Sequence, residues 1–314
     1  MRLGTISALT LPLVASTLSL AGTLVFDGFA DTSLLTINGG ATVQVTADGT
    51  VLRVTRATGG QAGSFFSSAT VDASSFSTKF SFRFTNPGGG PFDCNVTNGA
   101  DGLVFVVQSV SSSVGTGGAG IGYQGIPKSV GVEFDDWCNA SNHDPSSSHV
   151  GIVTNGSVNH GTGAPYTANV SPDLDAGDRW WAWVDYDGTT LRLYLNRDEV
   201  QPFQPIVTRT LDVPAILQQP TGYVGFTSGT GSDWANHDVI YWEYTDYSPV
   251  CVGDFNGDGT VDGGDLTILL AGWGSDLDAY DRVLMLDRRL LADGTPQQVR
   301  HALGDLRVGN HCCG

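Results

Sequence analysis

The chain has 314 residues, of which 15% are charged, and a formal net charge of −17. Its 15 Lys and Arg residues form no run, which argues against nucleic-acid binding because phosphate recognition depends on clustered cations. The 42 glycines, together with many β-branched and Ser residues before position 250, favour an all-β fold of short strands joined by tight turns.

Residues 1–21 have the pattern of a secretory signal peptide. Arg2 precedes an apolar stretch from Leu9 to Leu20, and the small residue Ala21 marks the expected cleavage point. No later segment reaches the roughly 18 apolar residues that a membrane-spanning helix needs. We therefore expect a secreted or cell-surface protein without a membrane span in the mature chain.

Residues 22–247 contain short runs in which apolar and polar residues alternate, as in half-buried strands. Turn signals such as DGTT separate the runs, and no helical periodicity of useful length occurs before Leu266. These features predict a sandwich. The expected strands are Val51–Thr55, Phe80–Phe84, Gly102–Gln108, Ser129–Phe134, His149–Val153, Arg179–Tyr186, Leu191–Leu195, Tyr223–Thr227 and Val239–Tyr244.

The five cysteines lack CxxC spacing, which argues against a zinc ribbon or a thioredoxin-type site. In an oxidising compartment we expect Cys94 to pair with Cys138, because such a bridge would clamp two candidate site loops together. Two unpaired buried thiols are the alternative.

An acidic segment runs from Glu133 to His149. Glu133 and Asp135 alternate along an expected strand, so both side chains leave the same face of the sheet. Asn139, Asp144 and His149 follow on a loop that can fold back over them. Hard oxygen ligands suit Ca²⁺, and a His beside carboxylates suits a transition ion such as Mn²⁺. The segment therefore predicts a metal site with two neighbouring ions, against the alternative of a solvated turn.

The same segment, VEFDDWCN…DPSSSHVGI, resembles the signature of the L-type (legume-like) lectins. The resemblance, to lectins of the bacterial type, extends from about Leu24 to Tyr244 and includes FDGF, ADGLVFVVQ, GGAGIGY, WVDYDGTTLRL and VGFTSGTGSDWANHDVIYWEY in family order. It implies a concanavalin-like jelly-roll sandwich of antiparallel sheets that binds a glycan or polysaccharide and is not an enzyme.

The resemblance also implies a ligand set for the two ions. In this family the metals perform no chemistry but hold the sugar-binding loops, so chelation should abolish binding. The implied ligands are Asp135 and Asp144 between the ions, Glu133 and His149 on the transition-metal side, and Asn139 with the carbonyl of Trp137 on the calcium side.

The implied sugar contacts come from several loops. Asp101, after a cis Ala100–Asp101 peptide, would accept hydrogen bonds from two adjacent hydroxyls. Asn139 and the backbone N–H of Gly118 would donate, and Trp137 would stack on the apolar side of the pyranose.

The remaining tryptophans of interest fall into two groups. Trp234 lies in the loop that sets specificity in the family, and it is either a second stacking platform or an exposed aromatic with no role. Trp180, Trp181 and Trp183 are expected to pack in the core and against the sheet.

Residues 248–274 contain a second acidic pattern. Six side chains occupy positions 1, 3, 5, 7, 9 and 12 of a loop that has Gly259 at position 6, the spacing that wraps oxygens around Ca²⁺. The segment resembles a single EF-hand-like dockerin repeat, although dockerins normally carry two repeats. We expect a calcium loop and helix that serves as a cell-surface or assembly tag, with a cohesin-like partner in doubt and a purely structural loop as the alternative. The expected ligands are Asp254, Asn256, Asp258, Thr260, Asp262 and Asp265.

Residues 275–314 match no known pattern, and a helical extension or a sequence artefact both remain open.

Two other functions compete with glycan binding. A glycoside hydrolase on the same fold would need two carboxylates at the scissile bond, whereas the chain has just three glutamates, Glu133, Glu199 and Glu243, and lacks the ExDxE pattern. A scaffold that has lost sugar binding is the other competitor, and the joint presence of Asp101, Gly118 and Asn139 argues against it.

Overall fold

The computed structural model describes residues 23–90, 98–115, 118–161 and 165–246. The expected signal peptide, the calcium repeat at 254–265 and the tail at 275–314 lie outside these residues. Within the described part of the chain, no helix combines the length and apolar character needed to cross a membrane.

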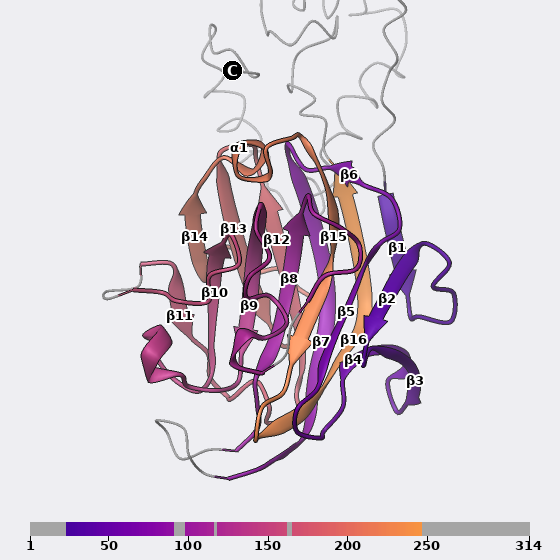
Figure 1. Ribbon diagram of the computed structural model, residues 1–314, viewed down its shortest axis with the longest axis vertical. Helices are drawn as coiled ribbons and strands as arrows, with labels where there is room; N and C mark the ends of the chain where they lie inside the picture. The colour runs from indigo at the N-terminus through magenta and orange to yellow at the C-terminus, as the bar shows by residue number, and fades with distance from the viewer. Residues whose placement is uncertain (1–22, 91–97, 116–117, 162–164, 247–314) are drawn as a thin grey trace, which may run out of the picture.

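Two eight-stranded antiparallel sheets form the fold (Figure 1). The first sheet has the order β14-β13-β12-β7-β16-β4-β3, and β1 pairs with β16. Its strands are β14 (Val207–Thr210), β13 (Thr190–Asn196), β12 (Arg179–Tyr186), β7 (Phe76–Gly88), β16 (Trp234–Asp246), β4 (Gly49–Thr55), β3 (Thr42–Thr46) and β1 (Thr23–Asp27).

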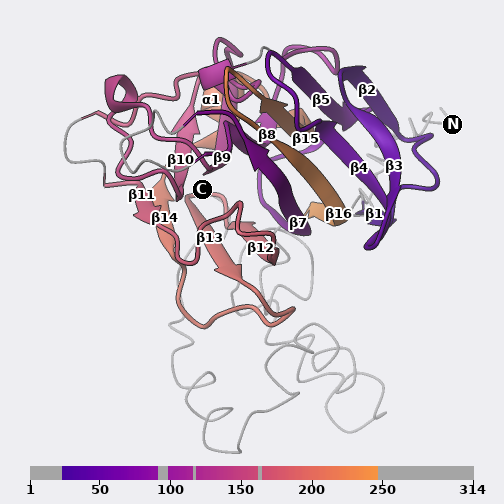
Figure 2. The ribbon, with the colours of Figure 1, turned by 90° about the horizontal axis from the view of Figure 1, so that it is seen from below.

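The second sheet packs on the first and has the order β11-β10-β9-β8-β15-β5-β2, with β6 paired to β15 (Figure 2). Its strands are β11 (Thr167–Asn169), β10 (His149–Thr154), β9 (Ser129–Asp135), β8 (Gly102–Gln108), β15 (Thr221–Gly229), β5 (Ala62–Ser67), β2 (Leu35–Gly39) and β6 (Val71–Asp72). Every strand expected from the sequence is present, so the predicted antiparallel sandwich is confirmed.

The described helices are short. The α-helix α1 (Val213–Leu217) begins after Asp212, whose side chain accepts a hydrogen bond from the N–H of Ala215 (2.9 Å). The 3₁₀ helices are η1 (Gly118–Gly120) and η2 (Ala140–Asn142). A helix of five residues gives no periodic signal, which is why the sequence did not predict α1.

The core between the sheets is dominated by phenylalanine. The Phe80 ring of β7 meets the Phe226 ring of β15 edge to face at 4.9 Å, and Phe82 lies 4.8 Å from Phe134 of β9. Because side chains alternate along β9, the burial of Phe134 in this core turns Glu133 and Asp135 to the opposite face of the sheet. Each fully buried Phe contributes about 1.5–3 kcal/mol, so the register of β9 is strongly fixed.

The β12 tryptophans pack as expected. Trp180 belongs to the core, whereas Trp181 and Trp183 lie on the other face of the strand yet are only 7% and 4% exposed. The guanidinium of Arg179 lies 4.6 Å and the ammonium of Lys79 lies 4.9 Å from the Trp181 ring. Cation–π packing thus covers this tryptophan.

Candidate functional site

The expected metal site forms at the paired strands β9 and β10. His149 stands opposite Asp135 in the antiparallel register, and Gly151 stands opposite Glu133. Directly opposite residues share a face, so the His149 imidazole lies beside both carboxylates. The loop between the strands returns Asp144 to the same place, where its ligand atom lies within 4.8 Å of those of Asp135 and His149. The residues predicted to gather here are therefore brought together.

The imidazole of His149 is oriented as a neutral ligand. Its Nε2 lies 3.8 Å from Glu133 Oε1 and 4.0 Å from Asp144 Oδ1, and all three side chains are at most 1% exposed. Its Nδ1 lies 2.9 Å from the carbonyl of Ser146, which can only accept, so Nδ1 carries the proton and the Nε2 lone pair faces the carboxylates. Burial lowers the pKa of His149 to about 4, which keeps the ring uncharged at neutral pH.

Ionisation is disfavoured for the aspartates of this cluster. Burial, followed by the charges of Asp144 and Glu133, raises the pKa of Asp135 well above its usual value. Burial likewise raises the pKa of Asp144 to about 7. Within the described residues, both Glu133 oxygens and Asp144 Oδ1 are buried without a hydrogen-bond partner. Buried, unpaired carboxylates are costly, and bound cations would remove that cost, so these residues fit the two ions that the fold family implies.

The loop that would hold the calcium side is tied to the same acids. The N–H of Trp137 donates to Asp135 Oδ1 (2.7 Å), and the N–H of Asn139 donates to Asp144 Oδ2 (2.6 Å). Asn139 precedes η2 but makes no side-chain capping bond there. Its carboxamide thus stays available for an ion or a hydroxyl, and both Trp137 and Asn139 are half-buried.

The expected sugar acceptor lies beside this loop. The Ala100–Asp101 peptide is cis, as predicted, and the N–H of Asp101 donates to the carbonyl of Gly229 (3.1 Å). Burial and the charges of Asp136 and Asp233 raise the pKa of Asp101 to about 8. Asp101 is 4% exposed, and its Oδ2 has no partner among the residues that the structure describes.

Gly118 and Trp234 were predicted to complete the sugar site. Gly118 begins η1, which contacts β15, the strand whose Gly229 also holds Asp101. A Cβ placed on Gly118 would meet no atom of the described residues within 4 Å. Trp234 is half-buried and packs on β7, where a Cβ on Gly88 would lie 2.6 Å from its indole Nε1. Its packing against Gly88 gives Trp234 a structural contact, and stacking on a sugar stays a prediction.

Sequence reasoning missed several buried residues at the site. Asp136 is 2% exposed and Asp233 is 1% exposed, and Asp136 Oδ2 lies 3.5 Å from His237 Nε2. His160 also joins the metal cluster, with its Nε2 lying 2.8 Å from Glu133 Oε1. Burial lowers the pKa of His160, but Glu133 and Asp144 outweigh that effect and raise it above its usual value. Asp136 and Asp233 lie inside motifs that the sequence had already singled out, whereas His160 lies beyond them.

Cys138 lies within the loop between β9 and β10. It is disulfide-bonded and 5% exposed. Its expected partner, Cys94, lies outside the described residues, so the Cys94–Cys138 bridge stays a prediction.

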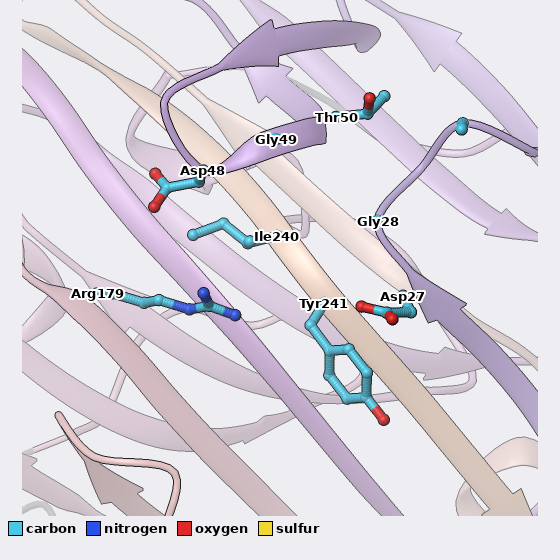
Figure 3. Close-up of a pocket in the computed structure, with 9 residues that line it drawn as sticks. Asp27, Gly28, Asp48, Gly49, Thr50, Arg179, Ile240 and Tyr241 are labelled. Atoms are coloured by element: carbon cyan, nitrogen blue, oxygen red, sulfur yellow. The ribbon is translucent and has the colours of Figure 1, made fainter.

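A separate pocket of about 240 Å³ lies on the outer face of the first sheet (Figure 3). Its charges are paired only in part: Arg83 lies 3.0 Å from Asp48, whereas Arg179 donates to the neutral Ser81 Oγ (2.8 Å). The Nε atoms of both arginines have no hydrogen-bond partner among the described residues. The lining residues are Asp27, Gly28, Ala30, Asp48, Gly49, Thr50, Arg179, Ile240 and Tyr241.

Comparison with known proteins shows the family and the fold. The family model described as "Legume lectin beta-barrel domain" matches residues 30–242. An Arabidopsis thaliana protein, the probable L-type lectin-domain containing receptor kinase I.2, is 30% identical over 246 residues, which are 70% of this chain and 35% of that protein. Receptor kinase VIII.1 of the same plant is 30% identical over 177 residues, 54% of this chain and 23% of that protein. The chain thus spans about a quarter of the length of the first curated relatives that it matches.

Solved lectin structures share the fold. The lectin from Bauhinia forficata in complex with GalNAc has a TM-score of 0.58 and 20% identity, and covers 72% of this chain and 98% of its own. The metal-free form of lectin I-B4 from Griffonia simplicifolia has a TM-score of 0.58 and 23% identity, and covers 72% of this chain and all (100%) of its own. The cis Ala100–Asp101 peptide, the gathered metal cluster and the family match agree, and the chain belongs to the family of legume-type lectin domains.

Proposed function

We propose that residues 23–246 bind a glycan through a site whose loops are held in place by Ca²⁺ and a neighbouring transition ion. The observation that carries the proposal is the set of buried carboxylate oxygens of Glu133 and Asp144 that have no hydrogen-bond partner among the described residues and surround His149. Bound ions would compensate these charges and fix the loop that carries Asn139. Fixing the loop in advance lowers the entropic cost of binding a sugar.

The chain's own residues would then recognise the sugar. Asp101 accepts hydrogen bonds from two adjacent hydroxyls, and the carboxamide of Asn139 and the backbone N–H of Gly118 donate. The half-buried ring of Trp137 covers the apolar face of the pyranose. A neighbouring cation also favours the ionised form of Asp101, the form that makes the stronger, charge-assisted hydrogen bonds.

Glycan binding is favoured over glycoside hydrolysis by where the glutamates lie. Glu199 pairs with Lys79 (2.6 Å), and Glu243 accepts a hydrogen bond from Tyr241, both on the outer face of the first sheet. Glu133 is buried in the metal cluster of the second sheet. The three glutamates are therefore not arranged as a pair that could flank one glycosidic bond.

A glycan array with the full chain tests this function. The array includes GalNAc and galactose ligands, because solved relatives are described as complexes with GalNAc and with galactose. We expect binding in Ca²⁺ and Mn²⁺, loss of binding in EDTA, and return of binding when the ions are added back. Release of shortened glycans would favour the hydrolase, and silence in every condition would favour the scaffold.

We further propose that the chain is secreted after cleavage behind Ala21, and that the loop from Asp254 to Asp265 is a calcium-binding attachment module. The apolar stretch at Leu9–Leu20 and the EF-hand-like spacing support these two proposals. Mass spectrometry of the exported protein is expected to give an N-terminus at Gly22. An intact Met1 on exported protein would contradict the cleavage.

A further inference from the structure

His160 occupies the metal cluster although no strand brings it there. It follows β10 by several residues, and its backbone N–H donates to the carbonyl of Asn142 in the metal loop (2.9 Å). The side chain of the preceding Asn159 donates to the carbonyl of Ser141 (3.2 Å), and its Oδ1 accepts from the N–H of Gly161 (2.9 Å). Two backbone anchors thus hold the His160 ring, only 4% exposed, against the cluster.

The nitrogen of His160 lies among the other ligand atoms at spacings that one ion permits. Its Nε2 lies 2.8 Å from Glu133 Oε1, 3.5 Å from Asp144 Oδ1 and 3.4 Å from His149 Nε2. Two ligands of one ion, each bound at about 2.0–2.2 Å, can be separated by at most about 4.4 Å. The ligand atoms of Glu133, His149 and His160 meet this limit in all three separations, which are 2.8, 3.4 and 3.8 Å.

The surroundings of His160 are shaped for this arrangement. A Cβ on Gly151 would lie 2.5 Å from Glu133 Oε1 and 3.2 Å from His160 Cε1, so only a glycine leaves room for both groups. Glu133 Oε1 has no hydrogen-bond partner in the described residues despite the nearby imidazole. The carboxylate oxygen of Glu133 and the imidazole nitrogen of His160 thus lie together in the cluster.

We infer that His160 is a direct ligand of the transition ion, so that the site offers two imidazoles with its carboxylates and prefers ions such as Zn²⁺, Co²⁺ or Ni²⁺ to Mn²⁺. The inference rests on the proposed metal-dependent function. It replaces the expected Mn²⁺ with an ion that comes later in the first transition-metal row. Imidazole nitrogen suits Zn²⁺, Cu²⁺ and Ni²⁺, whereas carboxylate and water suit Mn²⁺. His160 would take a coordination position that water fills in a site with one imidazole.

The test is competitive metal binding by the full chain after metal depletion. Zn²⁺ and Mn²⁺ are added together in the presence of excess Ca²⁺, and bound ions are counted by elemental analysis. Wild type should take up Zn²⁺ in preference to Mn²⁺. His160→Gln should lower Zn²⁺ affinity by at least about 10–100-fold, the usual cost of losing even an outer partner of a metal ligand. Unchanged Zn²⁺ affinity and unchanged preference in this variant would overturn the inference.

His143→Gln is the matched control, because His143 lies exposed in the same loop and the glutamine amide can keep its hydrogen bond to Asn159 Oδ1 (3.2 Å in the wild type). This variant should leave Zn²⁺ uptake unchanged. A second measurement needs no variant: pulsed electron paramagnetic resonance of the Cu²⁺-loaded wild type should detect two coupled imidazoles. A single imidazole would overturn the inference even if His160→Gln failed to fold. Glycan binding is measured separately on the array. If the chain binds glycans but the resonance spectrum shows one imidazole, the role of His160 is refuted and the proposed function stands. If the spectrum shows two imidazoles but no glycan binds, the proposed function is refuted and the role of His160 stands.

Discussion

Two acidic regions of the protein differ in how their negative charge is balanced. On the outer face of the first sheet, Asp48 is 19% exposed and lies 3.0 Å from Arg83, and Arg53 binds Asp238 through two hydrogen bonds of 2.7 Å. At the edge of β9 and β10, Glu133 is about 1% exposed and both its oxygens lack a hydrogen-bond partner within the described part of the chain. Arginine side chains balance the carboxylates of the first region, whereas we propose that bound ions balance those of the second.

The comparison teaches where function is to be sought. Beside the pocket in Figure 3, the carboxylate of Asp48 is balanced by the neighbouring Arg83. In the β9–β10 cluster, no Lys or Arg of the described residues is shown to pair with the buried carboxylates. Unsatisfied buried charge is therefore a better guide to this site than cavity volume.

The largest expected effect comes from removing the carboxylate of Asp144, which would lie between the two ions. Asp144→Asn should reduce metal affinity by at least about 100-fold, and glycan binding should be lost with it. Losing a residue that only hydrogen-bonds to a metal ligand costs about 10–100-fold, and the loss of a ligand itself should cost more. Calorimetry with Ca²⁺ and Zn²⁺ and the glycan array measure the two effects. The same change at Asp48 is the matched control and should leave both unchanged; equal losses in the two variants would break the comparison between the regions.

Asp101→Ala should eliminate glycan binding while the metals still bind. The change removes a carboxylate that accepts two charge-assisted hydrogen bonds, each contributing about 1.5–3 kcal/mol, so a loss on the order of 100-fold or more is expected. Circular dichroism and metal calorimetry verify that the fold and the ion site persist. Retained glycan binding would remove Asp101 from the site.

The metal-free chain should lose stability as the pH rises from 6.5 to 9. The folded-state pKa values of Asp144 (about 7) and Asp101 (about 8) lie above the usual 3.8, so the folded chain keeps protons that the unfolded chain has released. Stability is therefore lost as pH passes upward through those values. In the folded chain His149, whose pKa falls to about 4, is uncharged throughout this window. In the unfolded chain it releases its proton near the usual 6.5, so it adds a small opposite slope at the lower end of the window only.

Bound ions should reverse this trend, because they require the deprotonated carboxylates and bind more tightly as the pH rises. Melting temperatures with EDTA and with ions, at pH 6.5 and pH 9, measure both slopes. Identical melting temperatures at the two pH values in EDTA would show that the cluster does not carry uncompensated charge.

The smallest effect is expected at the paired region. Asp48→Asn weakens a partly exposed ion pair with Arg83, and such pairs contribute at most about 1 kcal/mol. Urea unfolding should show a change no larger than that. A loss of several kcal/mol would mean that Asp48 does more than pair with Arg83.

Much of the fold could be predicted from the sequence because alternation is a local property. Phe80, Phe82 and Phe84 alternate with polar residues, and β7 follows that pattern with all three rings in the core. The site residues Glu133 and Asp135 were predicted for the same reason, since their two-residue spacing places both on one face of β9. The pairing of the two sheets was expected from the lectin resemblance.

The missed residues depend on contacts that local patterns do not encode. His160 lies 11 positions beyond His149 and reaches the cluster because its N–H binds the carbonyl of Asn142. Asp136 follows Asp135 directly, so strand alternation would place it on the opposite face from the metal cluster. Its side chain is nevertheless buried, with Oδ2 3.5 Å from Nε2 of His237 in β16. Both placements follow from how the loop after β9 folds back, which depends on the whole tertiary structure.

The most direct test of the central claim is whether sugar and ions bind in a coupled way. If ions organise the sugar site, a glycan identified on the array must tighten Ca²⁺ binding by the same factor by which Ca²⁺ tightens glycan binding. Calorimetric titration of metal-depleted chain with Ca²⁺, with and without saturating glycan, measures this factor. We predict a Ca²⁺ affinity at least about 10-fold higher with the glycan, a coupling of about 1.4 kcal/mol or more; equal Ca²⁺ affinities in the two titrations would contradict the account.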